Sequence, residues 1–474
     1  MSTVIDTING LLWGHVLIYV LTGIGIYFTV RFGFIQFRNF GEMIRLTMST
    51  DEADKAGISP FQALAISLAS RIGTGNLAGV AVAIGVGGPG AIFWMWVVAM
   101  LGMATAMAES ALAQLYKVKG AHGNYRGGPA FYIAKGLKIP LLGTAFAVCL
   151  IFAFGIIINA VQSNSIAQAM ETSIGLPPIA SGLGIAALAG LVIFGGIRSI
   201  ARVAEILVPF MAGIYIIVAI WVLVTNLGAL PEVFLSIFRS AFGLQEVAGG
   251  AAGGMMVALL NGVKRGLFSN EAGMGSAPNI AAAATPVPHH PVSQGFVQAF
   301  GVFVDTILVC TATAVMIIVS GAHKMVDAEG NLLEGIVMTQ EAAAYFLGPF
   351  GAHFIAFAVL LFAFTTIIAC YGYAESGMSY LKLGSDKALA VLRLGVMAIV
   401  VWGSVQTVAL VFNAADAAIA VMAVMNLFAL ILLSPKMVHM VNDYRAQRAA
   451  GKVPEFHIAD HPELAEGVDV EIWK

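Results

Sequence analysis

The sequence predicts an all-α polytopic membrane protein, and three observations carry this prediction. Hydrophobic residues make up 59% of the 474 residues and charged residues 11%, whereas a soluble domain carries about 25% charged residues. Apolar runs of about 18 residues or more recur along the chain, each long enough to cross about 30 Å of hydrocarbon as a helix. These runs lack strict alternation of apolar and polar residues, which disfavours a β-barrel.

We expect about eleven membrane-spanning helices, in the order in which the apolar runs occur. A charged amphipathic segment at about 37–56 precedes the second span, and the loop at 322–348 is expected to contain a short helix at Thr339–Leu347. The expected spans are 11–31, 60–86, 89–115, 141–169, 178–195, 203–227, 249–283, 293–320, 351–379, 388–411 and 416–434.

The positions of lysine and arginine predict how the chain lies in a bacterial inner membrane. Cytoplasmic loops carry an excess of these residues. With the N-terminus outside and the C-terminus in the cytoplasm, 19 of the 24 basic residues lie inside. Arg239 and Lys324 lie outside, and Arg71, Lys264 and Arg265 fall within two unusual spans. This asymmetry supports the expected number of spans.

Those two spans, the second and the seventh, carry glycines beside charged or amide residues at mid-depth. The stretches are Ser70–Asn76 and Phe268–Asn279. Such a pattern is typical of an unwound segment that lines a cavity. Because the two spans lie five helices apart, they predict an inverted repeat with a binding site between its halves. The expected regions are 1–56 (an N-terminal helix and amphipathic segment), 57–227 and 228–435 (the two five-helix repeats), and 436–474 (a cytoplasmic tail).

If the second span is unwound at its middle, the C-terminal end of one half-helix and the N-terminal end of the other face the same cavity. Freed N–H groups suit a carboxylate, and freed carbonyls suit a cation. Gly73 and Gly75 permit unusual backbone conformations, while Thr74 and Asn76 can add side-chain oxygens. A mere kink, or close packing of glycine-rich helices, is the alternative. The recurrence of such a break in the seventh span favours a site.

Three further polar side chains lie within apolar spans. Thr365 and Thr366 in the ninth span are adjacent hydroxyls that could bind sodium, or could bond back to a carbonyl of their own helix. Gln162 in the fourth span could reach an ammonium or a carboxylate, or could join two helices structurally. The residues alone do not decide between binding and a structural role for the two threonines or for Gln162.

Charged residues within the spans are candidates for function. We interpret Arg71 and Glu271 mainly as gating or helix-break ions, with Glu271 close in sequence to Lys264 and Arg265. Asp305, midway along the eighth span, is the best candidate for a proton relay. Two more carboxylates, Glu109 and Glu375, lie near expected cytoplasmic ends, where a solvated or capped position is the default.

Nothing in the sequence indicates an enzyme or a cofactor. It has no P-loop, no glycine-rich nucleotide fingerprint and no nucleophile elbow, so we expect no use of ATP. A net charge of −2 gives no reason to expect nucleic acid as a partner, and no required protein partner is evident. His457 and His461 are four residues apart beside Asp460 and Glu463, and we interpret them as part of a solvated tail rather than as a metal site.

Residues Gly87–Gly102 consist of two glycines, small residues and then an aromatic run. This stretch resembles the signature of the alanine/glycine:cation symporter family, also called the sodium:alanine symporter family. The stretches Arg71–Asn76, Gly127–Tyr132 and Gly266–Asn279 also resemble that family, and the resemblance spans about residues 60–435.

The resemblance implies a leucine-transporter-like fold of the amino acid–polyamine–cation superfamily, with two broken helices and one extra N-terminal helix. It also implies sodium-driven import of L-alanine, D-alanine or glycine by alternating access. The transported amino acid and sodium would be the partners, with the ion as the only coupling factor. Arg71 departs from the leucine-transporter pattern, so the two binding pockets are not expected to be identical.

The resemblance also implies roles for particular residues. The amides of Thr74 and Gly75 would take the substrate carboxylate, with Gln162 on a substrate-facing helix. The substrate would reach across to the second break. Asn76 matches a ligand of a second sodium site. The residues expected to bind substrate are Thr74, Gly75, Asn76, Gln162, Gly273, Gly275 and Ser276, and those expected to bind sodium are Ala69, Ile72, Thr365 and Thr366.

Two other functions stay open at this stage. A proton-coupled amino-acid transporter of the same fold would use Asp305 or Glu271 as the titrating group. An amino-acid channel would move its solute only downhill, and its flux would survive removal of sodium.

Overall fold

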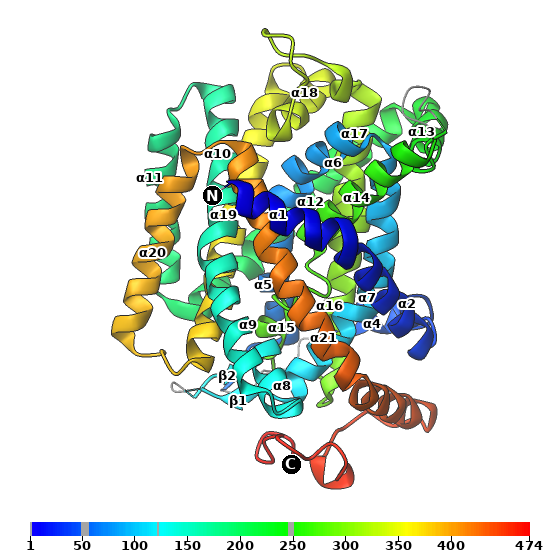
Figure 1. The fold of residues 1–474 in the computed structure, drawn as a ribbon, viewed down its shortest axis with the longest axis vertical. Coiled ribbons are helices and arrows are strands. Elements are labelled where there is room, and N and C mark those ends of the chain that lie inside the picture. Colours follow the sequence, from blue (N-terminus) through cyan, green and yellow to red (C-terminus); the bar gives the residue numbers. More distant parts are fainter. Residues whose placement is uncertain (1, 49–55, 121–122, 245–250) are drawn as a thin grey trace.

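In the computed structural model the chain is described at residues 2–48, 56–120, 123–244 and 251–474. These residues fold almost entirely into helices (Figure 1). A two-stranded antiparallel sheet pairs β1 (Val118–Lys119) with β2 (Tyr125–Arg126). The α-helices are α1 (Ser2–Leu12), α2 (Ile18–Arg31), α3 (Ile35–Arg38), α4 (Phe40–Thr47), α5 (Pro60–Arg71), α6 (Val80–Gly87), α7 (Gly90–Leu115), α8 (Pro129–Gly136), α9 (Pro140–Phe152), α10 (Ile158–Ile174), α11 (Pro178–Ile193), α12 (Gly196–Thr225), α13 (Leu230–Ala241), α14 (Ala251–Asn270), α15 (Pro278–Ala281), α16 (Pro291–Val302), α17 (Thr311–Ser320), α18 (Gly335–Leu347), α19 (Phe350–Tyr380), α20 (Asp386–Ser404) and α21 (Val408–Ala449).

Short turns of other helix types join or interrupt these helices. Four are π-helical; three of them lie within a longer helical run and widen the helix locally, while η2 forms the first turn after the end of α5. These are η1 (Trp13–Leu17), η2 (Gly75–Gly79), η3 (Ala153–Ile157) and η5 (Phe303–Cys310), and the 3₁₀ turns are η4 (Leu227–Ala229), η6 (Ala322–Lys324) and η7 (Ile458–Asp460).

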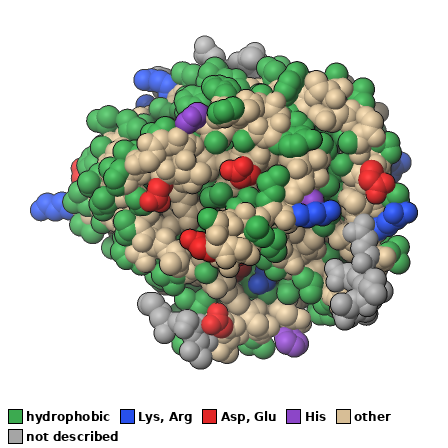
Figure 2. Space-filling view, turned by 90° about the horizontal axis from the view of Figure 1, so that it is seen from above, with side chains coloured by type: hydrophobic (Ala, Val, Ile, Leu, Met, Phe, Trp, Pro, Cys, Tyr) green, Lys and Arg blue, Asp and Glu red, His purple; other side chains and the backbone are tan. Residues whose placement is uncertain are grey.

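Eight helical runs among the described residues are long and apolar enough to cross a membrane. They are Val4–Arg31, Gly90–Leu115, Pro140–Ile174, Gly196–Thr225, Pro291–Ser320, Phe350–Tyr380, Asp386–Ser404 and Val408–Ala449, and two shorter apolar helices cover Gly75–Gly87 and Pro178–Ile193. Large apolar side chains point outward from these runs, for example Leu141 and Leu191, each at least 80% exposed. Figure 2, which views the molecule from its α18 end, shows hydrophobic side chains around the rim and charged side chains scattered singly. The chain is therefore a multi-pass, all-α membrane protein.

Several expected boundaries differ from the structure. The expected spans 388–411 and 416–434 place a turn near residue 412, but α20 ends at Ser404 and α21 begins at Val408. The segment between them, Val405–Thr407, is short and uncharged within a long apolar stretch, and the expected boundary lies after it. In addition, α21 continues past Pro435 to Ala449, and α13 was not expected. The expected total of eleven spans stays a prediction.

The two broken spans lie in the middle of the molecule (Figure 1). Ser59 caps α5 through a reciprocal capping box with Gln62, and the helix packs against α12, α16 and α19. It stops at Arg71 and resumes as η2 and α6. The other broken span consists of α14 and the single turn α15, separated by residues 271–277. Backbone hydrogen bonds between Ile58 and residues 283–285 join the start of α5 to the end of this second span.

The amphipathic segment after α2 forms α3 and α4 and is tied to the end of α21. Glu42 of α4 accepts hydrogen bonds from Arg45 (2.6 Å) and from the Tyr444 hydroxyl (2.7 Å). Burial raises the pKa of Glu42, but these hydrogen bonds outweigh burial and hold the pKa below its usual value. The carboxylate therefore stays ionised at neutral pH and keeps α4 attached to α21.

Candidate functional site

The break of α5 touches two other helices, because glycine leaves room for them. A Cβ on Gly73 would lie 2.4 Å from the Thr366 hydroxyl oxygen of α19 and 2.9 Å from Oε1 of Gln162 on α10. Both distances are shorter than any real contact of a Cβ, so a side chain at this position would push the three segments apart. The break therefore joins α19 on one side and α10 on the other.

Carbonyl and hydroxyl oxygens gather where α5 meets α19. The Thr366 hydroxyl donates to the carbonyl of Ala69 (2.8 Å), and the carbonyl of Phe362 also lies within hydrogen-bonding distance (3.0 Å). The Thr365 hydroxyl donates to the same Phe362 carbonyl (2.9 Å). All of these residues are buried. The peptide of Ile72 follows directly at the end of α5. Hard oxygen ligands of this kind suit an alkali cation.

The backbone N–H groups of the break face amide side chains. Thr74 donates its backbone N–H to Oε1 of Gln162 (3.0 Å), and Gly73 donates to Oδ1 of Asn76 (3.0 Å). The Thr74 hydroxyl is buried and has no hydrogen-bond partner among the described residues. A side-chain carbonyl thus holds an N–H group that could bind a carboxylate oxygen.

A small cavity lies beside this break. In the present conformation it has room for about one water molecule, so a larger solute requires some lining side chains to move. Its wall combines the break of α5 with residues of η3, α10, α14 and α21. The lining residues are Ser70, Arg71, Gly73, Gly75, Phe154, Ile158, Gln162, Phe268, Glu271, Met274 and Ile419.

Glu271 ties three segments together at the wall of the cavity. Its carboxylate accepts hydrogen bonds from Ser70 of α5 (2.5 Å), from Ser276 (2.6 Å) and from Tyr373 of α19 (3.1 Å). Its backbone has a φ of +59°, which is the left-handed region, and it is the first residue after α14. Glu271 therefore marks the point where the second span unwinds.

Arg71 brings a positive charge to the same wall. Its Nη1 donates to the Gln298 carbonyl of α16 (3.1 Å), and the side chain is almost fully buried. Its Nε and Nη2 have no hydrogen-bond partner among the described residues. Buried guanidinium nitrogens without partners are costly, so they favour any anionic group that can reach them.

The glycines of the second break face away from this cavity. Gly273 (φ +86°) donates its N–H to Glu109 (3.2 Å) and accepts from the Asn426 side chain (3.0 Å). Gly275 (φ +84°) packs against Pro129 and Asn426. These glycines let the backbone cross between α7 and α21, and neither lines the cavity.

Asp305 lies behind the break in a polar cluster of its own. Its carboxylate accepts from Asn76 Nδ2, Ser269 and Thr306, each at 2.7 Å. Asn76 therefore directs its amide nitrogen toward Asp305 and its carbonyl toward the N–H of Gly73. The aspartate and the α5 break are thus connected by one side chain.

Lys264 and Arg265, which are close to Glu271 in sequence, both lie against Asp416 of α21, with Arg265 Nη2 at 2.5 Å. The expectation of solvated or capped positions for Glu109 and Glu375 is wrong. Glu109 is fully buried, where it binds Gly273 and Asn426, and Glu375 is nearly buried and pairs with Arg126. Partners distant in sequence compensate these charges, and a single sequence does not show such partners.

The predicted residues therefore fall into separate groups. Gly75 and Gln162 line the cavity together with Arg71 and Glu271, and the backbone N–H of Thr74 bonds to the lining side chain of Gln162. Asn76 and Ser276 lie one hydrogen bond behind the wall. Sequence reasoning missed the apolar part of the wall, whose residue types are common in every span. These missed residues are Phe154, Ile158, Phe268, Met274 and Ile419.

Comparison with known proteins finds relatives that are named as sodium-coupled amino-acid transporters. The chain is 45% identical over 458 residues to a probable sodium/glutamine symporter of Bacillus subtilis, covering 96% of this chain and 93% of the relative. It is 40% identical over 440 residues to a sodium/alanine symporter of Methanococcus maripaludis (91% and 94%). A sodium/proton-dependent alanine carrier protein of Bacillus sp. strain PS3 is 38% identical over 433 residues (88% and 95%).

The characteristic sequence pattern of one family extends over nearly the whole chain. The pattern of the sodium:alanine symporter family matches residues 1–458, which include both broken spans and most of the tail. That family consists of sodium-coupled transporters and not of enzymes. The chain belongs to the sodium:alanine symporter family.

Proposed function

We propose that this protein imports small neutral amino acids together with sodium by alternating access. The observation that carries the proposal is the position of the α5 break. On one side of the break the Ala69 carbonyl accepts from the Thr366 hydroxyl, and on the other side the N–H of Thr74 bonds to Gln162, which lines the cavity. A cation site and a carboxylate site would thus share one short segment, so binding of one solute would order the segment for the other.

The sodium site of this proposal consists of oxygens from α5 and α19. The residues are those expected from the sequence, namely Ala69, Ile72, Thr365 and Thr366, with the carbonyl of Phe362 as an added ligand. Both threonine hydroxyls contact the Phe362 carbonyl, and the Thr366 hydroxyl also contacts the Ala69 carbonyl, so these oxygens are already linked. A sodium ion there would replace the hydrogen bonds between them and hold α5 against α19.

The substrate site of this proposal is the cavity beside the break. A zwitterion offers one carboxylate and one ammonium. The wall contains Arg71, Glu271 and Gln162, and the N–H of Thr74 lies one hydrogen bond behind it, at Gln162. The Gln162 carbonyl holds that N–H in the closed conformation, so the substrate carboxylate would displace it. Arg71 and Glu271 act as helix-break ions, because each ties the break to a neighbouring helix.

The remaining residues expected to bind substrate or sodium lie at the second break and next to Asp305, behind the break of α5. Gly273, Gly275 and Ser276 would contribute to the substrate site once the second span moves, since Ser276 contacts Glu271 at the wall. Asn76 would join a second sodium site only if its carbonyl turned away from Gly73. These motions belong to the inward- and outward-open conformations that alternating access requires.

A leucine-transporter-like arrangement of two five-helix repeats accounts for these contacts. The break of α5 and the break after α14 lie side by side, as a binding site between inverted repeats requires. In this arrangement the protein lies in the bacterial inner membrane with its N-terminus outside. The end that carries α8, the β-sheet and the C-terminus would then face the cytoplasm, and the α13 and α18 end would face outward (Figure 1).

The cavity favours a small side chain on the substrate. Phe268, Met274 and Ile419 occupy the space that a longer side chain would need. The named relatives include both alanine and glutamine transporters, so family membership alone does not select the amino acid. We therefore propose alanine or glycine as the substrate of this chain.

Sodium coupling supplies enough free energy for concentrative import. A tenfold sodium gradient is worth about 1.4 kcal/mol. A membrane potential of about 100 mV adds about 2.3 kcal/mol per charge. Together these terms support roughly 500-fold accumulation of a neutral solute at one ion per solute.

Proton coupling is the second candidate, and the Asp305 cluster favours it. A fully buried carboxylate that is linked to the α5 break through Asn76 could take up a proton in one conformation and release it in the other. Two relatives are named as sodium/proton-dependent alanine carriers, one of them as a putative one.

A competition experiment tests the substrate assignment. Uptake of labelled L-alanine into proteoliposomes would be measured with excess unlabelled glycine, D-alanine, L-glutamine or L-leucine. We expect glycine or D-alanine to compete strongly and glutamine and leucine weakly, and Phe268→Ala to admit larger side chains. Stronger competition by glutamine than by glycine would contradict the assignment to small amino acids.

A further inference from the structure

The chain after α21 folds back onto the protein and is held there by buried apolar side chains. Phe456 and Trp473 are fully buried, and Phe456 donates its backbone N–H to the His289 carbonyl (2.9 Å). Ile458 donates to the carbonyl of Trp473 (2.9 Å), and the ammonium of Lys117 lies over the Trp473 ring. The expectation of a solvated tail around His461 is therefore wrong, because buried apolar side chains such as Phe456 and Trp473 anchor the tail to the rest of the protein.

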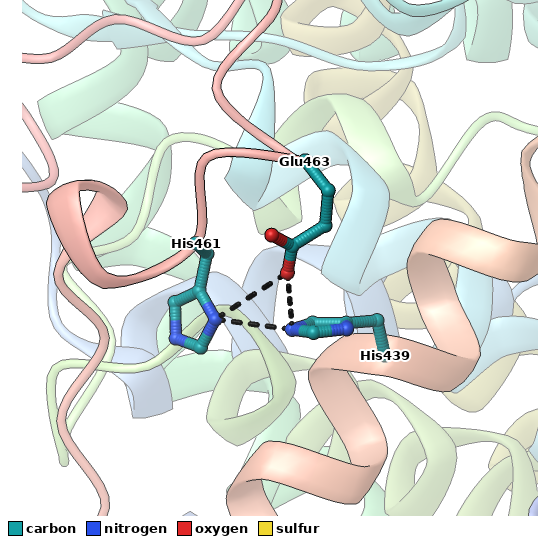
Figure 3. Close-up of side chains that lie close together, drawn as sticks. All are labelled: His439, His461 and Glu463. Atoms are coloured by element: carbon teal, nitrogen blue, oxygen red, sulfur yellow. Dashed lines mark hydrogen bonds and ion pairs between the residues drawn. The ribbon is translucent and has the colours of Figure 1, made fainter.

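Three potential metal ligands meet where this tail passes α21 (Figure 3). Nε2 of His439, on α21, lies 3.0 Å from Nδ1 of His461 and 2.8 Å from Oε1 of Glu463. The remaining distance, from His461 Nδ1 to Glu463 Oε1, is 3.9 Å. Figure 3 shows the three side chains pointing toward one another from the helix and from the tail.

These distances match the ligand spacing around a small divalent ion. Zinc binds histidine nitrogen and carboxylate oxygen at about 2.0–2.2 Å, which places tetrahedral ligand atoms roughly 3.3 Å apart. The three distances lie on both sides of that value. Hydrogen bonds alone do not account well for the close approach of the three atoms. His439 Nε2 faces both His461 Nδ1 and Glu463 Oε1, but a histidine nitrogen carries one proton at most and so has only one to donate.

The ring of His461 is held in place by its surroundings. It stacks on Phe456 with ring centroids 4.7 Å apart and an interplanar angle of 5°. Its other nitrogen, Nε2, lies 3.8 Å from the Asp443 carboxylate, which also contacts His290 (3.1 Å) and accepts from Gln447 (2.9 Å). A carboxylate behind a ligating histidine is typical of protein metal sites, since it fixes the orientation of the ring.

We propose that His439, His461 and Glu463 bind a divalent transition-metal ion of the Zn²⁺ type, and that the ion fastens the C-terminal tail to α21. The partly exposed side chains of His439 and Glu463 give the ion a path from solvent, and water would fill the fourth position. Two imidazoles and one carboxylate favour Zn²⁺, Co²⁺ or Ni²⁺ over Mg²⁺ and Ca²⁺, which prefer oxygen ligands. The site is separate from the proposed sodium and substrate sites.

Zinc titration of the purified full-length chain, without an affinity tag of histidines, tests the metal site. We expect one zinc ion per chain with a micromolar or tighter Kd by calorimetry, not displaced by Mg²⁺ or Ca²⁺. His439→Ala and Glu463→Gln should each weaken binding at least about tenfold. The matched control is His457→Ala, because His457 lies in the same tail but outside the cluster.

The results of that titration separate the alternatives cleanly. Equal zinc binding by the wild type and His439→Ala, or an equal loss in His457→Ala, would overturn the site. Absence of binding below millimolar zinc would show the cluster to be a hydrogen-bonded group only. His439 is the informative position because it lies on α21, so its loss leaves the apolar anchors of the tail in place.

A second measurement tests the fastening of the tail. Val470 is 59% exposed, so a fluorophore on Val470→Cys reports tail motion through its anisotropy. We expect zinc to raise the anisotropy in the wild-type background, a chelator to reverse the change, and His439→Ala to abolish it. Zinc binding without a change in anisotropy would overturn the fastening of the tail.

Discussion

Thr366 connects the two helices of the proposed sodium site through a single hydroxyl. Replacing it with valine keeps the shape but removes the oxygen that reaches Ala69 at 2.8 Å. We expect Thr366→Val to raise the sodium concentration for half-maximal alanine uptake at least about tenfold, the equivalent of about 1.4 kcal/mol. Uptake rates measured across a sodium series give this concentration directly.

Two other threonines serve as comparisons for that substitution. Thr365 bonds only within α19 and to Met211, so Thr365→Val should have a smaller effect than Thr366→Val. Thr313 is buried but bonds Tyr215 and its own helix, so Thr313→Val should leave the sodium dependence unchanged. An equal shift in all three variants would mean that the loss of any buried hydroxyl has this effect, and would remove the support for the site.

Gln162 holds the N–H of Thr74, which is the group assigned to the substrate carboxylate. Gln162→Met keeps the approximate volume and removes the acceptor at 3.0 Å. Because the side chain also lines the cavity, we expect the KM for alanine to rise several-fold while the sodium dependence changes little. Initial-rate measurements at saturating sodium would separate the two effects.

The control for Gln162 is another buried glutamine. Gln340 bonds backbone and hydroxyl groups around Ala169 and Ser173 and does not line the cavity. Gln340→Met should therefore leave the KM for alanine near the wild-type value. An unchanged KM in Gln162→Met would argue against a role of Gln162 at the substrate site.

At the residue level, the sequence indicates where the backbone is irregular better than it indicates which distant side chains contact one another. The breaks were identifiable because glycines stand beside charged or amide residues at mid-membrane depth, and the Thr365–Thr366 pair because two adjacent hydroxyls lie within an apolar span. The contact of Asp416 with Lys264 and Arg265 spans about 150 positions, and no local pattern encodes it. The apolar wall residues were equally hidden, since phenylalanine and isoleucine occur throughout every span.

The second break depends on glycine conformations that other residues adopt only with strain. Gly275 has a φ of +84°, and a Cβ there would lie 2.8 Å from Pro129 and 2.9 Å from both Asn426 and Phe146. The left-handed conformation alone costs an alanine about 1–2 kcal/mol, and the crowding adds to it. We expect Gly275→Ala to lower the midpoint of thermal unfolding in detergent and to reduce transport.

A glycine in open surroundings provides the matched control for that change. Gly213 lies in α12 with no atom within 4 Å of its would-be Cβ, so Gly213→Ala should be neutral or slightly stabilising. If Gly275→Ala proved as stable and as active as Gly213→Ala, the break would not require its present backbone shape.

The helices themselves were predictable where an apolar run ends in a clear signal. The start of α5 at Ser59 and Pro60 lies at the expected boundary, because the capping residues are recognisable in sequence. The turn between α20 and α21 was misplaced because the residues that mark it, Gly403 and the polar pair Gln406–Thr407, are few and uncharged within a long apolar stretch. The amphipathic α13 was missed because it is too short and too polar on one face to resemble a span.

At the scale of the whole molecule, the broken spans and the buried charged residues lie inside a shell of apolar helices. The broken spans occupy the centre, and the apolar helices around them present exposed hydrophobic side chains to the lipid (Figures 1 and 2). Composition predicted the membrane class because lipid leaves few structural options. The folded tail was not predicted, since its anchors are single apolar residues within a polar segment.

The proposed coupling is a property of the whole molecule, because it requires the sodium and substrate sites to open to the same side together. Neither site alone could drive accumulation. The α5 break links the two sites through about one turn of chain. A change at the contact between Thr366 and Ala69 therefore alters the position of the Thr74 N–H beside the cavity. Coupling of this kind is measurable only as transport across a sealed membrane.

The most direct test is uptake of labelled alanine by proteoliposomes under an inward sodium gradient, against matched potassium and proton gradients. We predict concentrative uptake with sodium only, and none when the sodium gradient is dissipated. Uptake driven by protons without sodium would assign the coupling to Asp305 or Glu271, and downhill flux indifferent to every gradient would indicate a channel. Either of those results, or the absence of alanine and glycine uptake under all gradients, would contradict the sodium-coupled mechanism proposed for this chain.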